Sequence, residues 1–294
     1  MEYIDICTPG GTLYVLDKFG IKARKKYGQN FLIDSNIVRK IISAAGITKE
    51  DCVLEIGPGI GTMTGMLSEA AGHVVAVEID ESLRPVLTET LAGRDNIDII
   101  WNDVLKTDLR EIADRHNGGR PMKVVANLPY YVTTPIIMKL LKEKGCFDSI
   151  TVMVQKEVAE RICSAPGNKN YGAITLAVKY YSEPEVVTDV PPNCFIPRPG
   201  VTSSVLCLKA RDEAPVSADE QFLFAVIRAS FNQRRKTIAN GIFSGLEHGD
   251  TNKNITREDV QKCLSEMGLK EDVRGEKLSL EEFAELSEKL RNMR

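Results

Sequence analysis

Short apolar runs alternate with amphipathic stretches through the first two-thirds of the chain. The runs have the length of buried strands, and between them, as in Thr62 to Ala71 and Ser82 to Leu91, apolar residues recur at three-and-four spacing. This alternation predicts an α/β fold with a doubly wound, mostly parallel sheet covered on both faces. The expected strands are 52–56, 74–79, 97–100, 124–126 and 150–154, followed by later strands at 186–190 and 204–209.

The last third of the chain has a helical pattern instead. Thr256 and Ser279 each precede an acidic residue by three positions, which is a helix-capping signature. We expect an N-terminal extension (1–18), an α/β domain (19–212) and a small helical C-terminal domain (213–294). The expected C-terminal helices are 218–231, 236–243, 257–267 and 280–290.

Composition is that of an ordinary globular protein, with 43% hydrophobic residues among 294. No apolar run approaches the roughly 18 residues of a membrane span, and the N-terminus lacks the pattern of a signal peptide. We therefore expect a cytoplasmic protein, acting as a monomer. The seven cysteines include no C-x-x-C pair, which fits a reducing compartment, and we expect no metal site.

The net charge of -3 does not by itself indicate a nucleic-acid-binding protein, but its distribution is uneven. One basic cluster lies near the start of the chain and includes Lys25 and Lys26. A second includes Arg234, Arg235 and Lys236. Two basic clusters flanking an α/β domain favour a track for a phosphate backbone.

A glycine-rich loop follows the first long apolar run. Gly57, Gly59 and Gly61 have G-x-G-x-G spacing, and glycines let a backbone approach a ligand closely. A dinucleotide fingerprint would need glycine at position 62, which is threonine, so pyrophosphate binding is disfavoured. Glu78 ends the next strand, where an acid can accept from ribose hydroxyls, and Asp103 follows the third, where it can accept from adenine. These groups predict a site for an adenosine moiety.

The fourth strand ends in Asn127-Leu128-Pro129-Tyr130. The amine nitrogen of adenine is a poor nucleophile because its lone pair is delocalised into the ring. The Asn127 side-chain oxygen and the Leu128 carbonyl could accept its two hydrogens and localise that pair, with Pro129 fixing the chain. Tyr130 offers a flat face on which an extruded base can stack. The tetrapeptide therefore predicts methylation of a planar amine.

These residues together resemble a known family. The glycine loop, Glu78 and Asp103 resemble the class I S-adenosylmethionine methyltransferases, which have a Rossmann-like fold. The Asn-Leu-Pro-Tyr sequence resembles the motif of the rRNA adenine N6,N6-dimethyltransferases. The resemblance implies that Gly57 lies beside the methionine end of the cofactor, Glu78 holds its ribose and Asp103 reads its adenine.

Three further motifs are similar to that family. The 27–32 segment resembles its G-Q-N-F-L motif, which implies that Asn30 and Leu32 contact the cofactor. The 195–199 segment resembles F-x-P-x-P, which implies that Phe195 stacks on the adenine opposite Tyr130. The following 201–204 segment reads V-T-S-S, where family members often have V-D-S. The 230–237 segment resembles F-x-x-R-R-K-T, which implies an RNA-backbone contact through its basic residues, of which Arg234 is the first.

The resemblance implies dimethylation of two adjacent adenines near the 3′ end of small-subunit rRNA, on an immature ribosomal subunit. One alternative is a large-subunit rRNA adenine methyltransferase that confers macrolide resistance, which shares the cofactor loops and the tetrapeptide. The long C-terminal region and the Phe195 loop favour the small-subunit enzyme. A non-catalytic RNA-binding or assembly factor and an NAD-dependent dehydrogenase are the alternatives from other classes.

Overall fold

The computed structural model describes residues 5–24, 27–233, 235–246 and 255–293. The chain forms two compact units. The first contains the described residues up to Ala159 together with Glu183–Ala210, and the second contains Glu160–Ser182 with the described residues from Arg211 onward. Helix α7 (Lys156–Ile162) runs from the first unit into the second. Residues 160–182, which the sequence pattern assigns to the α/β domain, thus cluster with the C-terminal helices.

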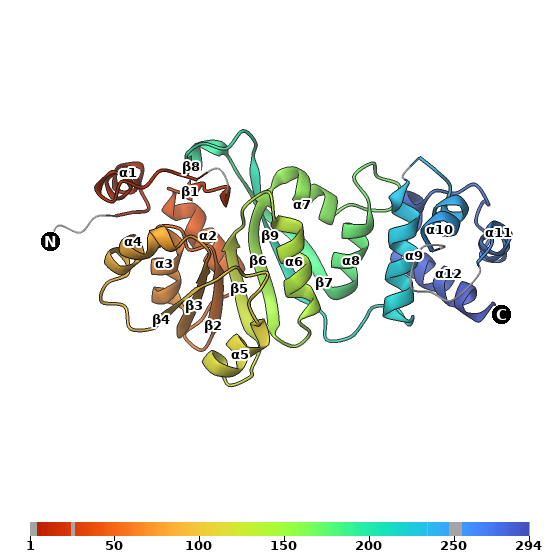
Figure 1. Cartoon of the computed structure of the whole chain (residues 1–294), viewed down its shortest axis with the longest axis horizontal. Coiled ribbons are helices and arrows are strands. Elements are labelled where there is room, and N and C mark those ends of the chain that lie inside the picture. Colours follow the sequence, from red (N-terminus) through yellow and green to blue (C-terminus); the bar gives the residue numbers. More distant parts are fainter. Residues whose placement is uncertain (1–4, 25–26, 234, 247–254, 294) are drawn as a thin grey trace. The chain divides into compact units, whose positions relative to one another are not determined.

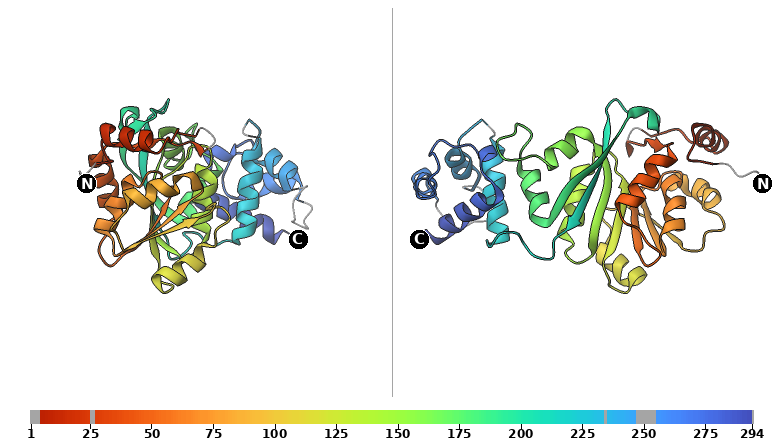
Figure 2. Two further views of the ribbon diagram at one scale, coloured as in Figure 1. Left: turned by 60° about the vertical axis from the view of Figure 1, so that its left-hand side comes forward. Right: turned by 180° about the vertical axis from the view of Figure 1, so that it is seen from behind.

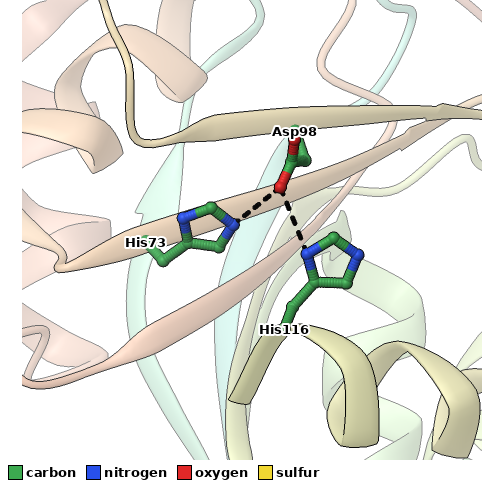
Figure 3. Close-up of side chains that lie close together, drawn as sticks. All are labelled: His73, Asp98 and His116. Carbon is green, nitrogen blue, oxygen red and sulfur yellow. Dashed lines mark hydrogen bonds and ion pairs between the residues drawn. The ribbon is translucent and has the colours of Figure 1, made fainter. Parts of the chain in front are cut away.

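A seven-stranded sheet forms the centre of the described part of the first unit, in the order β4-β3-β2-β5-β6-β9-β7 (Figure 1). Strands β2 to β6 pair in parallel, and β9 runs antiparallel to β6. The strands are β2 (Cys52–Ile56), β3 (His73–Glu78), β4 (Ile97–Trp101), β5 (Met122–Asn127), β6 (Phe147–Gln155), β7 (Ser182–Val190) and β9 (Ser203–Ala210). The expected doubly wound, mostly parallel sheet is confirmed. The amino-terminal parts of β3 and β4 carry His73 and Asp98 (Figure 3).

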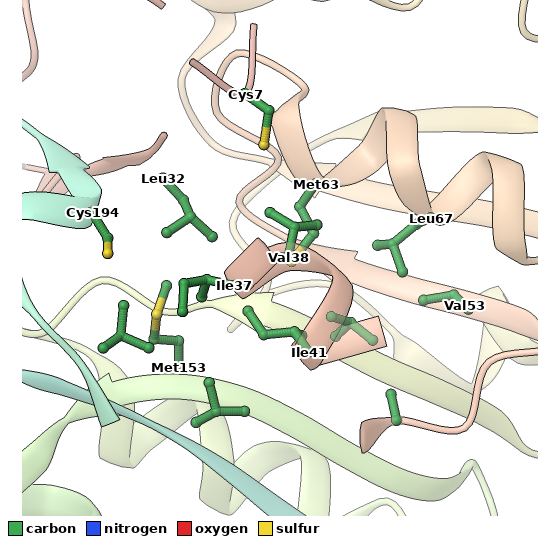
Figure 4. Packing of buried hydrophobic residues seen from close by; sticks show 14 of the residues in the cluster. Cys7, Leu32, Ile37, Val38, Ile41, Val53, Met63, Leu67, Met153 and Cys194 are labelled. Carbon is green, nitrogen blue, oxygen red and sulfur yellow. The ribbon is translucent and has the colours of Figure 1, made fainter. Parts of the chain in front are cut away.

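Helices cover both faces of this sheet, with α2 and α6 on opposite sides (Figures 1 and 2). The α2 face holds a core in which branched aliphatic side chains of α2 and α3 meet those of the strands (Figure 4). The helices of the first unit are α1 (Pro9–Lys18), α2 (Ser35–Ala44), α3 (Thr62–Ala70), α4 (Arg84–Thr90), α5 (Leu109–Asn117) and α6 (Thr133–Lys142). A separate two-stranded ladder joins β1 (Phe31–Leu32) to β8 (Phe195–Ile196).

The described part of the N-terminal segment packs onto the first unit. Helix α1 is capped by the Thr8 side chain, which accepts from the backbone N–H of Gly11. Val15 of this helix is buried with Ile60 of the glycine loop and Val86 of α4. Lys18 forms an ion pair of 2.6 Å with Glu89. Residues that the sequence pattern sets apart as an extension therefore cover the glycine loop.

The second unit is helical and contains α8 (Ala173–Tyr181), α9 (Glu220–Asn232), α10 (Ile238–Leu246), α11 (Arg257–Glu266) and α12 (Leu280–Asn292). Helix α9 packs against α8, α10 and α12. The predicted helices and both predicted capping boxes, at Thr256 and Ser279, are confirmed. None of the helices in the described ranges is long and apolar enough to cross a membrane.

Candidate cofactor and catalytic site

A cavity of about 280 Å³ lies at the carboxyl ends of β2, β3, β4 and β5. The chain connections diverge at this point, since β3 and β4 lie on one side of β2 while β5 and β6 lie on the other. Open parallel sheets bind their ligands at such switch points. The predicted site residues that line the cavity are Asn30, Leu32, Gly57, Gly59, Glu78, Asp103, Asn127, Leu128, Pro129 and Tyr130.

The glycine loop forms the floor of the cavity beside the end of β3. Gly57 and Gly59 have φ values of 72° and 61°, a left-handed conformation that strains other residues. A Cβ on Gly59 would also approach the Phe31 ring to 3.3 Å. The Gly59 N–H donates to Glu78 Oε2 at 3.3 Å, which ties the loop to the end of β3.

Two acids line the cavity at the ends of β3 and β4, Glu78 as the last residue of β3 and Asp103 just after β4. Glu78 is only 4% exposed, and burial raises the pKa of its carboxyl group. Its Oε1 accepts from the Asp80 N–H at 2.7 Å, which orients the group at the cavity wall. Asp103 lines the same cavity, and its Oδ1 accepts from the Leu105 N–H at 2.9 Å, which turns the chain after β4.

Asn127 is oriented by a hydrogen bond to the loop that precedes β1. Its Nδ2 donates to the backbone carbonyl of Asn30 at 2.9 Å. The amide nitrogen is therefore turned toward Asn30, and the side-chain oxygen is the acceptor of this amide. The Leu128 N–H donates to the Met153 carbonyl at 3.1 Å, which holds the tetrapeptide on the sheet after β5 ends. The Pro129 carbonyl then accepts from Val132 at 3.2 Å, closing a turn.

The two predicted aromatic walls differ in accessibility. Tyr130 is half-buried and lines the cavity, and its hydroxyl is 2.6 Å from Ser203 Oγ. Phe195 is fully buried and packs in the core beneath α2. Its strand β8 pairs with β1, opposite Leu32. Phe195 does not line this cavity in the closed ladder, and its predicted stacking on the target adenine stays a prediction.

A network of hydrogen bonds, which we call the clasp, joins Arg24 and Gln29 to Asp80, just after the end of β3. Gln29 Nε2 donates to Asp80 Oδ2, and Arg24 Nη1 donates to Asp80 Oδ1, both at 3.0 Å. The Arg24 N–H in turn donates to Gln29 Oε1 at 2.8 Å. Because the Asp80 N–H also donates to Glu78, the clasp connects Arg24 and Gln29 to the carboxylate that lines the cavity at the end of β3.

Glu55 is a cavity residue that the sequence analysis missed. It lies on β2 and is fully buried, and among the described residues neither of its carboxylate oxygens has a hydrogen-bond partner. Burial is the main cause that raises its pKa to about 8; the nearby Thr64 hydroxyl, which makes no hydrogen bond by geometry, acts to lower the pKa, and the charge of Glu78 adds to the rise. The signal in the sequence was an acid inside an otherwise apolar strand. An unpartnered buried acid at this wall fits a ligand that carries an amino group, as the methionine end of S-adenosylmethionine does.

The predicted RNA-contacting residues are only partly described. Arg235 and Lys236 are exposed on the second unit, between α9 and α10. Lys25, Lys26 and Arg234 lie outside the described residues.

Comparisons with known proteins agree with this geometry. A model of the ribosomal RNA adenine dimethylase family matches residues 20–289. A ribosomal RNA small subunit methyltransferase A from Lachnoclostridium phytofermentans is 53% identical, covering 95% of this chain and 96% of its own. The protein of the same name from Geobacillus thermodenitrificans is 49% identical, with 97% of each chain covered.

Among solved structures, a dimethyladenosine transferase from Plasmodium falciparum is similar to this chain, with a TM-score of 0.72 and 26% identity. The match covers 87% of this chain and 95% of the other. The expected fold class and enzyme class are confirmed, and the methyl donor is S-adenosylmethionine. The chain belongs to the ribosomal RNA adenine dimethylase family.

Proposed function

We propose that this enzyme methylates the N6 amines of two adjacent adenines near the 3′ end of small-subunit (16S) rRNA, giving N6,N6-dimethyladenosines. The observation that carries this proposal is the orientation of Asn127, whose nitrogen bonds Asn30 so that its oxygen is the acceptor at a cavity built for adenosine. The names of the relatives at 53% and 49% identity favour the small subunit over the large-subunit alternative.

The proposed catalysis rests on positioning and on hydrogen-bond acceptors. Bound S-adenosylmethionine supplies an electrophilic methyl group. The Asn127 side-chain oxygen and the Leu128 carbonyl accept the N6 hydrogens of the target adenine, which favours a tetrahedral nitrogen with a localised lone pair. Pro129 fixes the direction of the Leu128 carbonyl. No strong base is needed, because the protonated product amine is acidic and loses its proton readily.

The proposed cofactor contacts follow the cavity wall. Glu78 holds the ribose, Asp103 accepts from the adenine of the cofactor, and Gly57 and Gly59 give the backbone room beside the methionine end. Asn30 and Leu32 cover this end of the cavity from the loop that the clasp secures. In this proposal Asn127 lies between the cofactor and the target base.

The target adenine requires a binding surface of its own. We propose that Tyr130 stacks on this base, since its ring lines the cavity while its hydroxyl bonds Ser203. Phe195 supplies the opposite wall only if the pairing between β1 and β8 opens when RNA binds, because its side chain is fully buried with the ladder closed. Stacking of Phe195 on the base therefore requires this ladder to open.

We propose that the substrate is an immature small ribosomal subunit in the cytoplasm and that the enzyme acts as a monomer. In this proposal residues 19–212 bind the cofactor and the base, and residues 213–294 form a helical domain that contacts RNA. Arg235 and Lys236 would neutralise phosphates there, and Lys25, Lys26 and Arg234 are proposed to do the same.

Deletion of the gene tests the assignment of the substrate. Primer extension on rRNA from the deletion strain should show loss of the stops that N6,N6-dimethyladenosines cause near the 3′ end of 16S rRNA. Complementation with the wild-type gene should restore them. If those adenines stay dimethylated without the gene, the proposed substrate is wrong. If the stops are lost but are restored by an Asn127→Ala protein that transfers no methyl group in vitro, the protein acts as an assembly factor instead.

A further inference from the structure

We propose that His73, Asp98 and His116 form a binding site for a divalent transition-metal ion such as Zn²⁺. His73 Nε2 lies 3.0 Å and His116 Nδ1 lies 3.2 Å from the same oxygen, Asp98 Oδ2 (Figure 3). The three potential ligand atoms lie within 4.8 Å of one another. Two imidazoles and a carboxylate are a donor set that Zn²⁺ and related ions prefer.

Three elements of the fold hold these side chains together. His73 begins β3, and Asp98 lies on β4 opposite Val75, so the two side chains point to the same face of the sheet. His116 lies in the last turn of α5, which ends at the left-handed Gly118. The His73 and His116 rings are stacked, with 5.7 Å between their centroids and 17° between their planes. The cluster therefore does not depend on one flexible loop.

The spacing of the ligand atoms suits a small tetrahedral ion. Metal–ligand bonds of about 2.0–2.1 Å place neighbouring ligand atoms roughly 3.3 Å apart. Two of the three pairs, at 3.0 Å and 3.2 Å, are close to this value, and the two histidine nitrogens lie within 4.8 Å of each other. The negative end of the α5 dipole lies beside His116 and favours a cation. Three protein ligands leave a fourth position for water, and the half-exposed Asp98 gives an ion access.

The site is separate from the catalytic cavity. His73 and Glu78 lie at opposite ends of β3. At the usual rise per residue of a strand, their backbones are roughly 16 Å apart. Cys52 is buried and pairs with His73 on the neighbouring strand, so the test below must distinguish thiolate from nitrogen and oxygen ligands. A metal here would join β3, β4 and α5 without contacting the cofactor or the base.

Titration of the metal-free full-length protein with CoCl₂, followed by visible absorption, tests this proposal. We expect one equivalent to bind with tetrahedral d–d bands and no thiolate charge-transfer band, and ZnCl₂ to displace it and raise the melting temperature. Asp98→Asn and His116→Gln should each weaken binding at least about tenfold. Asp95→Asn, an exposed acid three residues earlier, should bind like the wild type.

The three substituted proteins should keep the circular dichroism spectrum of the wild type, since Asp98 is half-exposed and asparagine preserves its volume. Three results would overturn the proposal. They are the absence of stoichiometric binding to the wild type, unchanged affinity in Asp98→Asn and His116→Gln, and a thiolate charge-transfer band, which would locate the ion on cysteines. If the three side chains bind only protons, the wild type will show no stoichiometric metal binding.

Discussion

The side-chain nitrogen of Asn127 donates a hydrogen bond of 2.9 Å to the backbone carbonyl of Asn30. This bond joins the tetrapeptide after β5 to the loop before β1, which are far apart in the sequence. Because the nitrogen is engaged, the oxygen of the same amide is oriented as an acceptor at the cavity. The loop that covers the cofactor site therefore also orients the proposed catalytic group.

Loss of the clasp should weaken cofactor binding. Gln29→Ala removes the donor to the buried Asp80 Oδ2, at a cost of about 1–3 kcal/mol, or roughly 5- to 150-fold in the dissociation constant if the loop must close to bind. Isothermal titration with S-adenosylhomocysteine measures this change. The rate at saturating cofactor should change much less. Gln221→Ala on the exposed face of α9 is the matched control, and equal affinity in both variants would contradict the role of the clasp.

Glu55 should make stability depend on pH. Its pKa is raised from 4.5 to about 8, so between these values the folded protein binds a proton that the unfolded chain has lost. The free energy of unfolding should therefore fall as pH rises through this range and level off above about 8. Urea unfolding of the wild type and Glu55→Gln at a series of pH values checks this, since the substitution should remove that part of the slope. Parallel curves for the two proteins would show that Glu55 is already ionised.

Binding of the cofactor should also draw a proton from Glu55. An ammonium group beside the carboxylate favours its charged form, so binding near pH 7 should release protons. Calorimetry in buffers of different ionisation enthalpy counts those protons. Glu55→Gln is the control, because every other titrating group of the protein and the ligand is the same in both proteins. The difference in released protons therefore belongs to Glu55.

Substitutions of Phe195 separate its two possible roles. Phe195→Ala should lower the free energy of unfolding by about 3–5 kcal/mol, because the ring is fully buried. Phe195→Leu keeps much of the apolar volume but removes the aromatic face. If the ring stacks on the target base after the β1–β8 ladder opens, this variant should methylate RNA roughly 5- to 150-fold more slowly. That factor corresponds to the loss of about 1–3 kcal/mol of stacking free energy. If folded Phe195→Leu transfers methyl groups at the wild-type rate, Phe195 has a packing role only and does not stack on the base.

The exposed basic pair of the second unit should contribute to RNA affinity through counterion release. Replacing both Arg235 and Lys236 with alanine should reduce the slope of log affinity against log salt by roughly 1.5. Filter binding to immature small subunits at several salt concentrations measures the slope. Lys270→Ala, another exposed cation of this unit, is the control. An unchanged slope in the double variant would show that Arg235 and Lys236 do not contact the RNA backbone.

Most of the fold could be predicted from the sequence because local pattern determined it. Strands β2 to β6 are mostly apolar, and each later helix has an apolar face, with a clear start at Thr256 and at Ser279. The site at the carboxyl ends of the strands followed from parallel pairing, which brings Glu78, Asp103 and Asn127 to one edge.

The features that could not be predicted depend on contacts between distant segments. Burial of Phe195 follows from the pairing of β8 with β1, which a two-residue strand does not reveal. The meeting of His73 with His116 depends on where α5 returns to the sheet. Glu55 could have been noticed, since a charged residue within a buried strand is expensive without a partner.

The most direct test of the account is transfer of labelled methyl groups to purified immature small subunits by the wild type and Asn127→Ala. Mass analysis should identify N6,N6-dimethyladenosine, with four methyl groups per subunit, in the wild-type reaction. Asn127→Ala should bind the cofactor within a few-fold but transfer about 10²- to 10³-fold more slowly, as expected for loss of one acceptor. The exposed Asn36→Ala should resemble the wild type. Near-normal transfer by Asn127→Ala, or methylation of a different nucleoside, would contradict the account.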